Sequence, residues 1–373
     1  MVSNSALFQP IKVGNHQLEH RVVLAPLTRF RGDENHVPTD LQAEYYAQRA
    51  TKGGLLITEA TFINGRDAGG YPCVPGIYNQ EQIEGWKKVT SAVHEKGGLI
   101  YLQLWHVGRA TLRCFLPNKA QPVSASDIPI QGPSMVDPSQ EHEVPRSLSI
   151  DDIAEITQEY AQASKNAVAA GFDGVEIHGA NGYLIDQFLN TSSNFRTDQY
   201  GGSIENRGRF ALEVVKAVSD AIGAERVGIR LSPWSEFQDM KDDTPYETWG
   251  YLIEQLQKNH SDLAFVHMIE PRDDFSRKTR NDTVNTLDPF RAVWKGSFIS
   301  AGGYTTKPEL ATEVADKTGN LIAIGRAFIA NPDIVYRLKN SIPLTKYNRD
   351  TFYTPGPVGY TDYPFAEQEE VKA

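Results

Sequence analysis

The residues best placed to do chemistry follow one short apolar run, residues 174–178. This run ends in His178, and Asn181 and Tyr183 come within the next five positions. An imidazole, a carboxamide and a phenol at the carboxyl end of a buried strand can hold a polarised oxygen and supply a proton. A lone histidine or tyrosine at a strand end usually has a packing role, but the three together favour a functional site.

The same segment predicts a turn from strand to helix. Gly179 and Gly182 relieve backbone crowding around Asn181, so the polar side chains can face a cavity while the chain reverses. Residues 184–189 then carry apolar side chains at helical spacing. The catalytic candidates are therefore Tyr183, His178 and Asn181.

The rest of the chain repeats this strand and helix alternation. We expect strands at residues 21–25, 55–59, 99–104, 174–178, 227–231, 263–268, 298–301 and 321–324, and helices at 41–51, 81–96, 150–170, 204–222, 245–259, 307–317 and 332–339. Alternation of this kind implies parallel strands joined by right-handed crossovers. Eight units predict an α/β fold of the closed (β/α)8 TIM barrel type, as a single domain over residues 1–365. An open doubly wound sheet is the alternative, but no G-x-G-x-x-G follows the first strand.

One connection is too long for a simple turn. Residues 105–149 are rich in proline and polar residues, and loops of this length usually carry function or a small structure of their own. We expect a capping excursion over the top of the barrel after the third strand, with a small hairpin or cap. Residues 366–373 are expected to form a flexible tail.

The composition indicates which kinds of partner the protein is not expected to bind. The formal net charge is −10, from 37 basic and 47 acidic residues, which disfavours nucleic acid binding. The two cysteines, Cys73 and Cys114, form no CxxC motif, and neither a signal peptide nor a long apolar segment is visible. We expect a cytoplasmic protein that binds no membrane, no nucleic acid and no metal, as a monomer or a homodimer.

Two glycine-containing strand ends predict a phosphate site. Gly302 and Gly303 follow the seventh strand, and Gly325 and Arg326 follow the eighth. In such barrels the loops after these two strands often bind phosphate, through backbone N–H groups and a guanidinium. An ordinary turn and a surface ion pair would explain either motif alone, but the pairing of both favours the phosphate.

Residues 188–207, with Arg196, Gly201, Gly202 and Arg207 in a polar segment, resemble the long signature of the old yellow enzyme family, the FMN-dependent ene-reductases. The resemblance extends over about residues 7–365 and is close to the fungal and plant branch. It implies tightly held, non-covalent FMN, with the phosphate at Gly302, Gly303, Gly325 and Arg326, and NADPH or NADH as the hydride donor.

The resemblance also assigns residues to the flavin ring. Pro26 and Thr28 follow the first strand, and the Thr28 hydroxyl matches the family threonine that bonds the flavin C4 carbonyl, although a turn or helix cap would equally use a threonine. Gln103 matches the residue that contacts the N3–H and carbonyl edge, and Ala60 is expected to offer backbone contact only. Arg230 lies inside an apolar strand, where a cation needs a partner, either the flavin or an internal carboxylate such as Glu176.

The family reaction defines the remaining roles. A reduced nicotinamide gives hydride to the flavin, which then reduces the β-carbon of an alkene conjugated to a carbonyl or nitro group. In this scheme His178 and Asn181 bind the activating oxygen of the substrate, and Tyr183 protonates the α-carbon. Trp105 and Tyr353 are expected to contact the substrate, although a core position explains the spacing of Trp105 nearly as well. Asp273 and Phe275 are expected in rim loops.

Other functions stay open at this point. A specialised reductase of a fungal biosynthetic pathway, like the ergot-alkaloid aldehyde reductases, competes with a general reductase of small activated alkenes. A metal-dependent barrel hydrolase would use His106, His178, Asp186 and a carboxylate from another strand as metal ligands, but the sequence has no His-x-His motif after the first strand. A non-catalytic flavin-binding protein is the third class.

Overall fold

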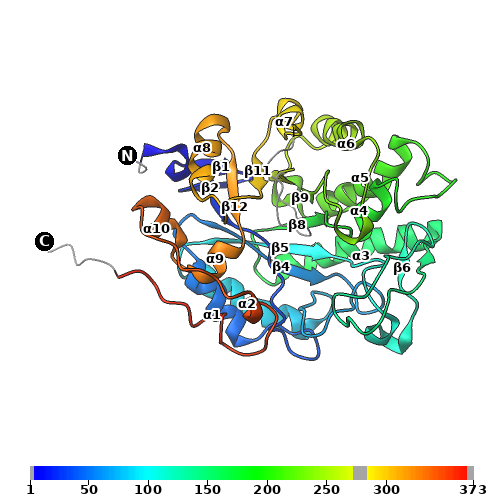
Figure 1. Ribbon diagram of the computed structural model, residues 1–373, viewed down its shortest axis with the longest axis horizontal. Helices are drawn as coiled ribbons and strands as arrows, with labels where there is room; N and C mark the ends of the chain where they lie inside the picture. The colour runs from blue at the N-terminus through cyan, green and yellow to red at the C-terminus, as the bar shows by residue number, and fades with distance from the viewer. Residues whose placement is uncertain (1–3, 272–283, 368–373) are drawn as a thin grey trace, which may run out of the picture.

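The computed structural model describes residues 4–271 and 284–367. Its centre is a closed barrel of parallel strands in the order β10-β11-β12-β3-β4-β5-β8-β9 (Figure 1). The strands are β3 (Val22–Leu24), β4 (Leu55–Phe62), β5 (Leu99–Trp105), β8 (Gly174–Gly179), β9 (Val227–Leu231), β10 (Phe265–Ile269), β11 (Phe298–Ala301) and β12 (Leu321–Ile324). The predicted (β/α)8 barrel is confirmed, and β9, β11 and β12 have the predicted bounds.

Helices surround the barrel, as Figure 1 shows with α1 and α2 below the strands and α6, α7 and α8 above them. Their bounds are α1 (Asp40–Arg49), α2 (Gln80–His94), α3 (Ile150–Ala169), α4 (Leu184–Leu189), α5 (Ile204–Ile222), α6 (Pro245–Asn259), α7 (Asp288–Val293), α8 (Glu309–Thr318), α9 (Arg326–Ala330) and α10 (Ile334–Lys339). The sequence patterns did not predict α7 and α9, because each has only five or six residues and shows no helical period.

Local sequence signals account for the helix that precedes the central strand β8. At the start of α3, the Ser149 hydroxyl accepts a hydrogen bond from the Asp152 backbone N–H at 3.1 Å, and the Asp152 carboxylate accepts one from the Ser149 N–H at 2.8 Å. This reciprocal capping satisfies backbone donors that the helix itself leaves free. The helix then packs on α5, and both cover the outside of β8 and β9.

The barrel interior is filled by side chains rather than by solvent. Apolar residues that point inward from neighbouring strands form a core that includes Val23, Ile57, Tyr101 and Phe265. Glycines make room for the two rings: a Cβ atom at Gly174 would lie 2.3 Å from the Tyr101 ring, and one at Gly228 would lie 2.2 Å from the Phe265 ring. Large and small inward residues on adjacent strands therefore interlock below the site.

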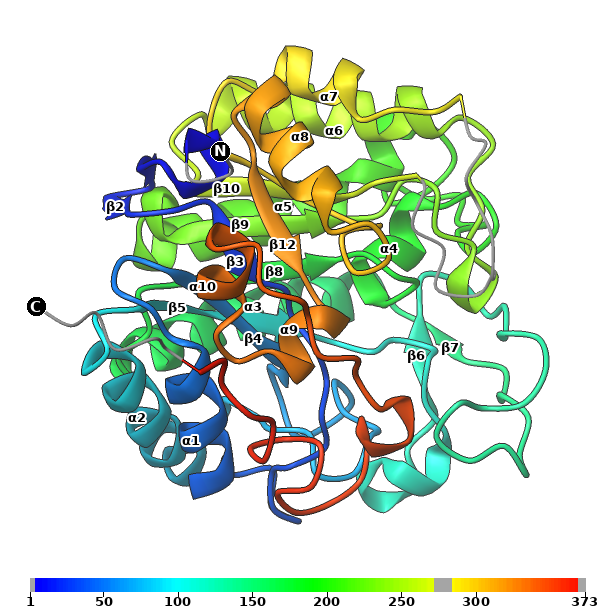
Figure 2. The same cartoon turned by 60° about the vertical axis from the view of Figure 1, so that its left-hand side comes forward.

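A short hairpin closes the amino-terminal end of the barrel. Strands β1 (Ile11–Val13) and β2 (His16–Leu18) pair antiparallel, and Val13 and Leu18 join the interior core. Figure 2 shows β2 beside the amino terminus, on the opposite side from β6 and β7. The sequence analysis did not anticipate this hairpin.

The excursion between β5 and α3 contains two 3-10 turns and the strands β6 (Val123–Ser124) and β7 (Arg146–Ser147). The expectation of a small hairpin is wrong for this pair, because β6 and β7 run parallel. They are joined by more than twenty residues, so the intervening chain has room to cross over before it pairs. An antiparallel bridge links Pro133 and Glu141 within that chain.

The predicted tail lies mostly outside the described residues, which end at residue 367. Within the described ranges, no helix is both long and apolar enough to cross a membrane.

Candidate active site

A single cavity at the carboxyl ends of the strands collects the residues predicted for the site. The empty space within it and at its solvent-exposed mouth is about 1360 Å³. All predicted site residues line it: Pro26, Thr28, Ala60, Gln103, Trp105, His178, Asn181, Tyr183, Arg230, Gly302, Gly303, Gly325, Arg326 and Tyr353. The barrel thus brings together residues from most of its strand ends.

The imidazole of His178 has a defined tautomer. Its Nδ1 atom accepts a hydrogen bond from the Ala180 backbone N–H at 3.3 Å, so the proton of the neutral ring must sit on Nε2. Burial lowers the pKa of His178 well below its ordinary value, and electrostatic interactions with Arg230 and His267 lower it further. The ring is therefore neutral at physiological pH and offers one N–H donor.

Asn181 occupies a strained turn that points its side chain into the cavity. Its φ of 57° lies in the left-handed region, and Gly182 follows with a φ of 74°. The Asn181 N–H donates to the Ser232 hydroxyl at 2.8 Å, and its carbonyl accepts from the Gln238 side chain at 3.0 Å. The Gly182 N–H donates to the Asp186 carboxylate at 2.8 Å. Three hydrogen-bonding partners thus hold a backbone conformation that asparagine adopts more readily than most residues.

An aromatic cluster fixes the ring of Tyr183. The ring meets Trp105 at a centroid distance of 4.7 Å and an interplanar angle of 87°. Trp105 in turn stacks on Phe62 and on Tyr71, each at 5.3 Å. Burial raises the pKa of Tyr183 above its ordinary value, and the nearby Tyr353 adds to the effect, so the phenol keeps its proton.

Below the cavity, a buried carboxylate connects three strands. Glu176 of β8 accepts a hydrogen bond from the Gln103 amide of β5 at 2.7 Å and lies 2.6 Å from Nδ1 of His267 of β10. Each oxygen of Glu176 therefore has a partner, Gln103 or His267. Glu176 is the carboxylate that the sequence analysis named as an alternative partner for Arg230.

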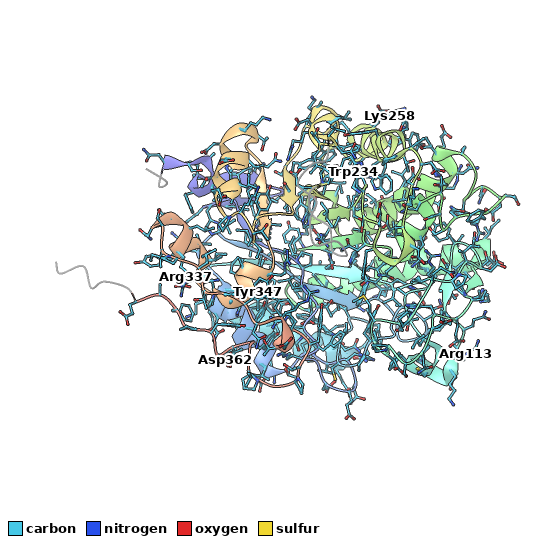
Figure 3. The ribbon with its side chains drawn as sticks, viewed as in Figure 1. Arg113, Trp234, Lys258, Arg337, Tyr347 and Asp362 are labelled. Atoms are coloured by element: carbon cyan, nitrogen blue, oxygen red, sulfur yellow. The ribbon has the colours of Figure 1, made fainter. Side chains whose placement is uncertain are left out.

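The glycines and the arginine that were predicted to bind a phosphate also line the cavity. Gly302 and Gly303 have φ angles of 119° and 80°, which side chains with a Cβ rarely adopt. The Arg326 guanidinium lies 5.8 Å from the ring centroid of Tyr347. Tyr347 is labelled in Figure 3. An open backbone and a partly exposed cation suit an anion such as phosphate.

The charge of the cavity is opposite to that of the chain. Four arginines line it, Arg29, Arg230, Arg326 and Arg349, and no carboxylate does so among the described residues. The protein as a whole carries a formal charge of −10. A cavity with this field favours a ligand with a phosphate and a ring that becomes anionic when reduced.

Several lining residues were not found from the sequence. Arg349 and Phe352 come from the carboxyl-terminal segment, and Met135 and Phe237 from loops far from them in the chain. No motif marks these residues, since side chains of irregular segments follow no helical or strand period. The segment near Phe352 is held by Arg29 and Arg31, which donate to its backbone carbonyl at 3.1 and 2.7 Å.

The residues of the hydrolase alternative have other partners. Nε2 of His106 lies 3.2 Å from the Asp67 carboxylate, and Asp186 accepts from Asn190 at 2.9 Å as well as from Gly182. In the described part of the chain, no three histidine, cysteine or acidic residues are grouped to hold a metal. The predicted rim residues Asp273 and Phe275 lie outside the described residues.

The barrel fold and the comparisons with known proteins define the class of this protein, a barrel oxidoreductase. The chain belongs to the NADH:flavin oxidoreductase / NADH oxidase family, the old yellow enzyme family, whose model matches residues 6–345. It is accordingly an oxidoreductase that binds FMN, uses NAD(P)H and acts on small molecules.

Relatives with similar sequences and structures extend over nearly the whole chain. Flavin oxidoreductase hxnT of Emericella nidulans is 54% identical over 97% of this chain and 98% of its own. The 12-oxophytodienoate reductase 1 of Oryza sativa subsp. japonica is 50% identical over 97% of this chain and 93% of its own. The structure of morphinone reductase in complex with tetrahydroNAD superposes with a TM-score of 0.89, at 42% identity, over 98% of each chain. The old yellow enzyme homologue of Zymomonas mobilis gives a TM-score of 0.88, at 40% identity, over 96% of this chain and 99% of its own.

Proposed function

We propose that the protein is an ene-reductase, which reduces the carbon–carbon double bond of an alkene conjugated to a carbonyl or nitro group. The observation that carries this proposal is the grouping of His178, Asn181 and Tyr183 on one wall of the cationic cavity. Bound FMN would supply the chemistry by taking a hydride from the nicotinamide and passing it to the β-carbon of the alkene. The protein must then stabilise the substrate oxygen and deliver a proton.

The residues around the cavity suit the parts of FMN. Gly302, Gly303, Gly325 and Arg326 would bind the phosphate through backbone N–H groups and a guanidinium. Thr28, Gln103 and Arg230 would bind the polar edge of the ring, with backbone contacts from Pro26 and Ala60. Arg230 would also stabilise negative charge on the reduced ring, which a neutral side chain could not do.

His178 and Asn181 would bind the substrate oxygen. The Nε2–H of the neutral His178 ring and the carboxamide of Asn181 are both donors, and both line the cavity. Donors held in advance stabilise the negative charge that develops on this oxygen without reorganising during the reaction. The partners of the Asn181 backbone explain how a loop residue can keep that position.

Tyr183 would protonate the α-carbon. Its raised pKa makes the phenol a weak acid, but it ensures that the proton is present over the whole physiological pH range. Transfer is still favourable, because an enolate carbon is a stronger base than a phenolate. Trp105 and Tyr353 would contact the rest of the substrate, one fixing the Tyr183 ring and the other lying half-exposed at the cavity mouth.

The decisive experiment follows the two half-reactions separately. The purified protein is reduced anaerobically with NADH or NADPH, and the bleaching of flavin absorbance is recorded. Reoxidation is then tested with cyclohexenone, a nitroalkene, 12-oxophytodienoate and morphinone, with a saturated ketone as control. The last two substrates are those in the names of the relatives. Alkene-dependent reoxidation with formation of the saturated product is expected. A flavin that every nicotinamide reduces but no activated alkene reoxidises would exclude the ene-reductase proposal.

A further inference from the structure

The buried carboxylate of Glu176 has a place in the site that the proposed reaction does not use. Glu176 is 0% exposed and lies on β8, two residues before His178. Its Oε1 atom accepts from Nε2 of Gln103 at 2.7 Å, and its Oε2 atom lies 2.6 Å from Nδ1 of His267. A charged group at this depth is costly unless it has a specific partner on each oxygen, as it has here.

The chemistry of a carboxylate settles which way the neighbouring amide faces. An ionised carboxylate can only accept hydrogen bonds, so the amide group of Gln103 that faces it must be the NH₂ and not the oxygen. The Gln103 oxygen must then point away from Glu176. Since Gln103 lines the cavity, this orientation presents an acceptor to a bound ligand.

The strand register makes the arrangement rigid. Gln103 and Glu176 are paired residues of the neighbouring strands β5 and β8, and the Gln103 backbone N–H donates to the Thr58 hydroxyl of β4 at 3.1 Å. His267 is in register with Arg230 of the neighbouring strand β9, so both partners of the carboxylate and the arginine are carried by adjacent barrel strands. Both partners of Glu176 therefore come from barrel strands rather than from loops.

We infer that Glu176 is a positioning residue for the flavin: it holds the Gln103 carboxamide with its oxygen toward the N–H of the flavin ring, and it places a negative charge beneath that ring. The inference rests on FMN occupying this cavity. The fixed oxygen selects the protonated imide edge of the flavin. The negative charge opposes Arg230 and makes the reduced, anionic ring less stable than Arg230 alone would.

The test measures flavin binding and flavin potential rather than turnover. Apo-protein is prepared from the wild type and from the variants Glu176→Gln, Glu176→Asp and Gln103→Ala, and FMN is titrated by fluorescence quenching. We expect Glu176→Gln to weaken FMN binding about tenfold, the value of one hydrogen bond, because the Gln103 amide can then rotate. The midpoint potential of the bound flavin is expected to become more positive, because the variant removes a buried negative charge.

The other variants separate orientation from charge. Glu176→Asp keeps the charge but is one methylene too short to reach Gln103, so it should weaken FMN binding while the potential stays near that of the wild type. In a Gln103→Ala background, Glu176→Gln should no longer weaken FMN binding but should still raise the potential. An effect of Glu176→Gln on binding that is equally large without the Gln103 side chain would overturn the positioning role.

A matched control is Glu59→Gln. Glu59 is another fully buried glutamate, on β4, but it accepts from Gln42 at 2.8 Å and from the Arg29 N–H at 3.2 Å, outside the barrel. This variant should change thermal stability without shifting the flavin potential, whereas equal shifts in both variants would overturn the inference. A wild-type apo-protein that binds no FMN would contradict the cofactor assignment itself. FMN binding and a flavin potential that stay unaltered in the Glu176 variants would instead contradict only the role inferred for Glu176.

Discussion

The imidazole of His178 and the phenol ring of Tyr183 meet edge to face, with ring centroids 5.0 Å apart and an interplanar angle of 75°. The two side chains therefore approach the cavity from adjacent positions but in different planes. In the proposed reaction, a substrate with its oxygen bound at the imidazole would present its α-carbon to a separate acid. This geometry favours a division of labour between oxygen binding and proton delivery, which the following variants test.

Replacing both oxygen donors should uncouple substrate binding from flavin binding. The double variant His178→Ala and Asn181→Ala is expected to retain FMN but to reduce cyclohexenone roughly 10²–10³-fold more slowly, the usual cost of losing such donors. Stopped-flow reoxidation of the reduced enzyme measures this rate. His94→Ala, which removes an exposed histidine on α2, serves as the control. Wild-type rates in the double variant would exclude the assigned roles.

Removing the Tyr183 hydroxyl should slow only one half-reaction. Tyr183→Phe keeps the ring against Trp105 but removes the acid, so reoxidation by enones should slow roughly 10²–10⁴-fold while reduction by nicotinamide stays near normal. Rapid mixing of each half-reaction gives both rates. Tyr160→Phe is the matched control, because the buried Tyr160 hydroxyl has no hydrogen-bond partner in the described part of the chain. Equal slowing of both halves in Tyr183→Phe would contradict this role.

Loss of the guanidinium at the proposed phosphate site should weaken the binding of the cofactor. Arg326→Ala is expected to weaken FMN binding by about one to two orders of magnitude, as for the loss of a charge-assisted hydrogen bond. Release is measured as the rise in free flavin fluorescence after dilution. The control Arg113→Ala removes an exposed arginine of the excursion, marked in Figure 3. Unchanged retention in Arg326→Ala would place the phosphate elsewhere.

A buried histidine far from the site should make stability depend on pH. Burial lowers the pKa of His20 to about 4, while its side chain accepts from the Val22 N–H at 3.2 Å and contacts the Thr51 hydroxyl at 2.8 Å. The unfolded chain binds a proton near pH 6.5 that the folded chain excludes, so stability is lost as pH falls from 6.5 toward 4. At pH 5 the loss is about 2 kcal/mol relative to pH 7.5.

A comparison of the wild type with the variant His20→Gln isolates the contribution of His20 to the pH dependence of stability. Burial raises the pKa of Glu59 and of Asp186 to about 7. The effect of these two carboxyl groups on stability is opposite to that of His20, because the folded state loses stability as the pH rises and they ionise. The free energy of unfolding in urea is measured for the wild type and for His20→Gln at pH 7.5 and pH 5. Subtracting the values of the variant from those of the wild type cancels the contributions that both proteins share. The stability of the wild type should fall relative to that of the variant at pH 5; parallel curves would contradict the assignment to His20.

Much of the fold could be read from local patterns. The runs that became β9, β11 and β12 have the predicted bounds, because a buried parallel strand is a short and mostly apolar run. Strand β4 continues to Phe62, beyond the predicted end at Glu59, through an irregularity between Ile57 and Ala60 that breaks the period. Thr58 and Glu59 are buried polar residues, and their partners lie in other parts of the chain.

The amino-acid sequence by itself determined the alternation of strands and helices, and the placement of His178, Asn181 and Tyr183 on one turn, because these depend on neighbours a few residues apart. Only the tertiary structure decided that four arginines surround one cavity, that Met135 and Arg349 line it, and that Glu176 is shared by Gln103 and His267. Gln103 and Glu176 are 73 residues apart, and Glu176 and His267 are 91 apart. Contacts over such distances exist only when the barrel closes and brings its strands into register, and no local pattern encodes which inward side chains then meet.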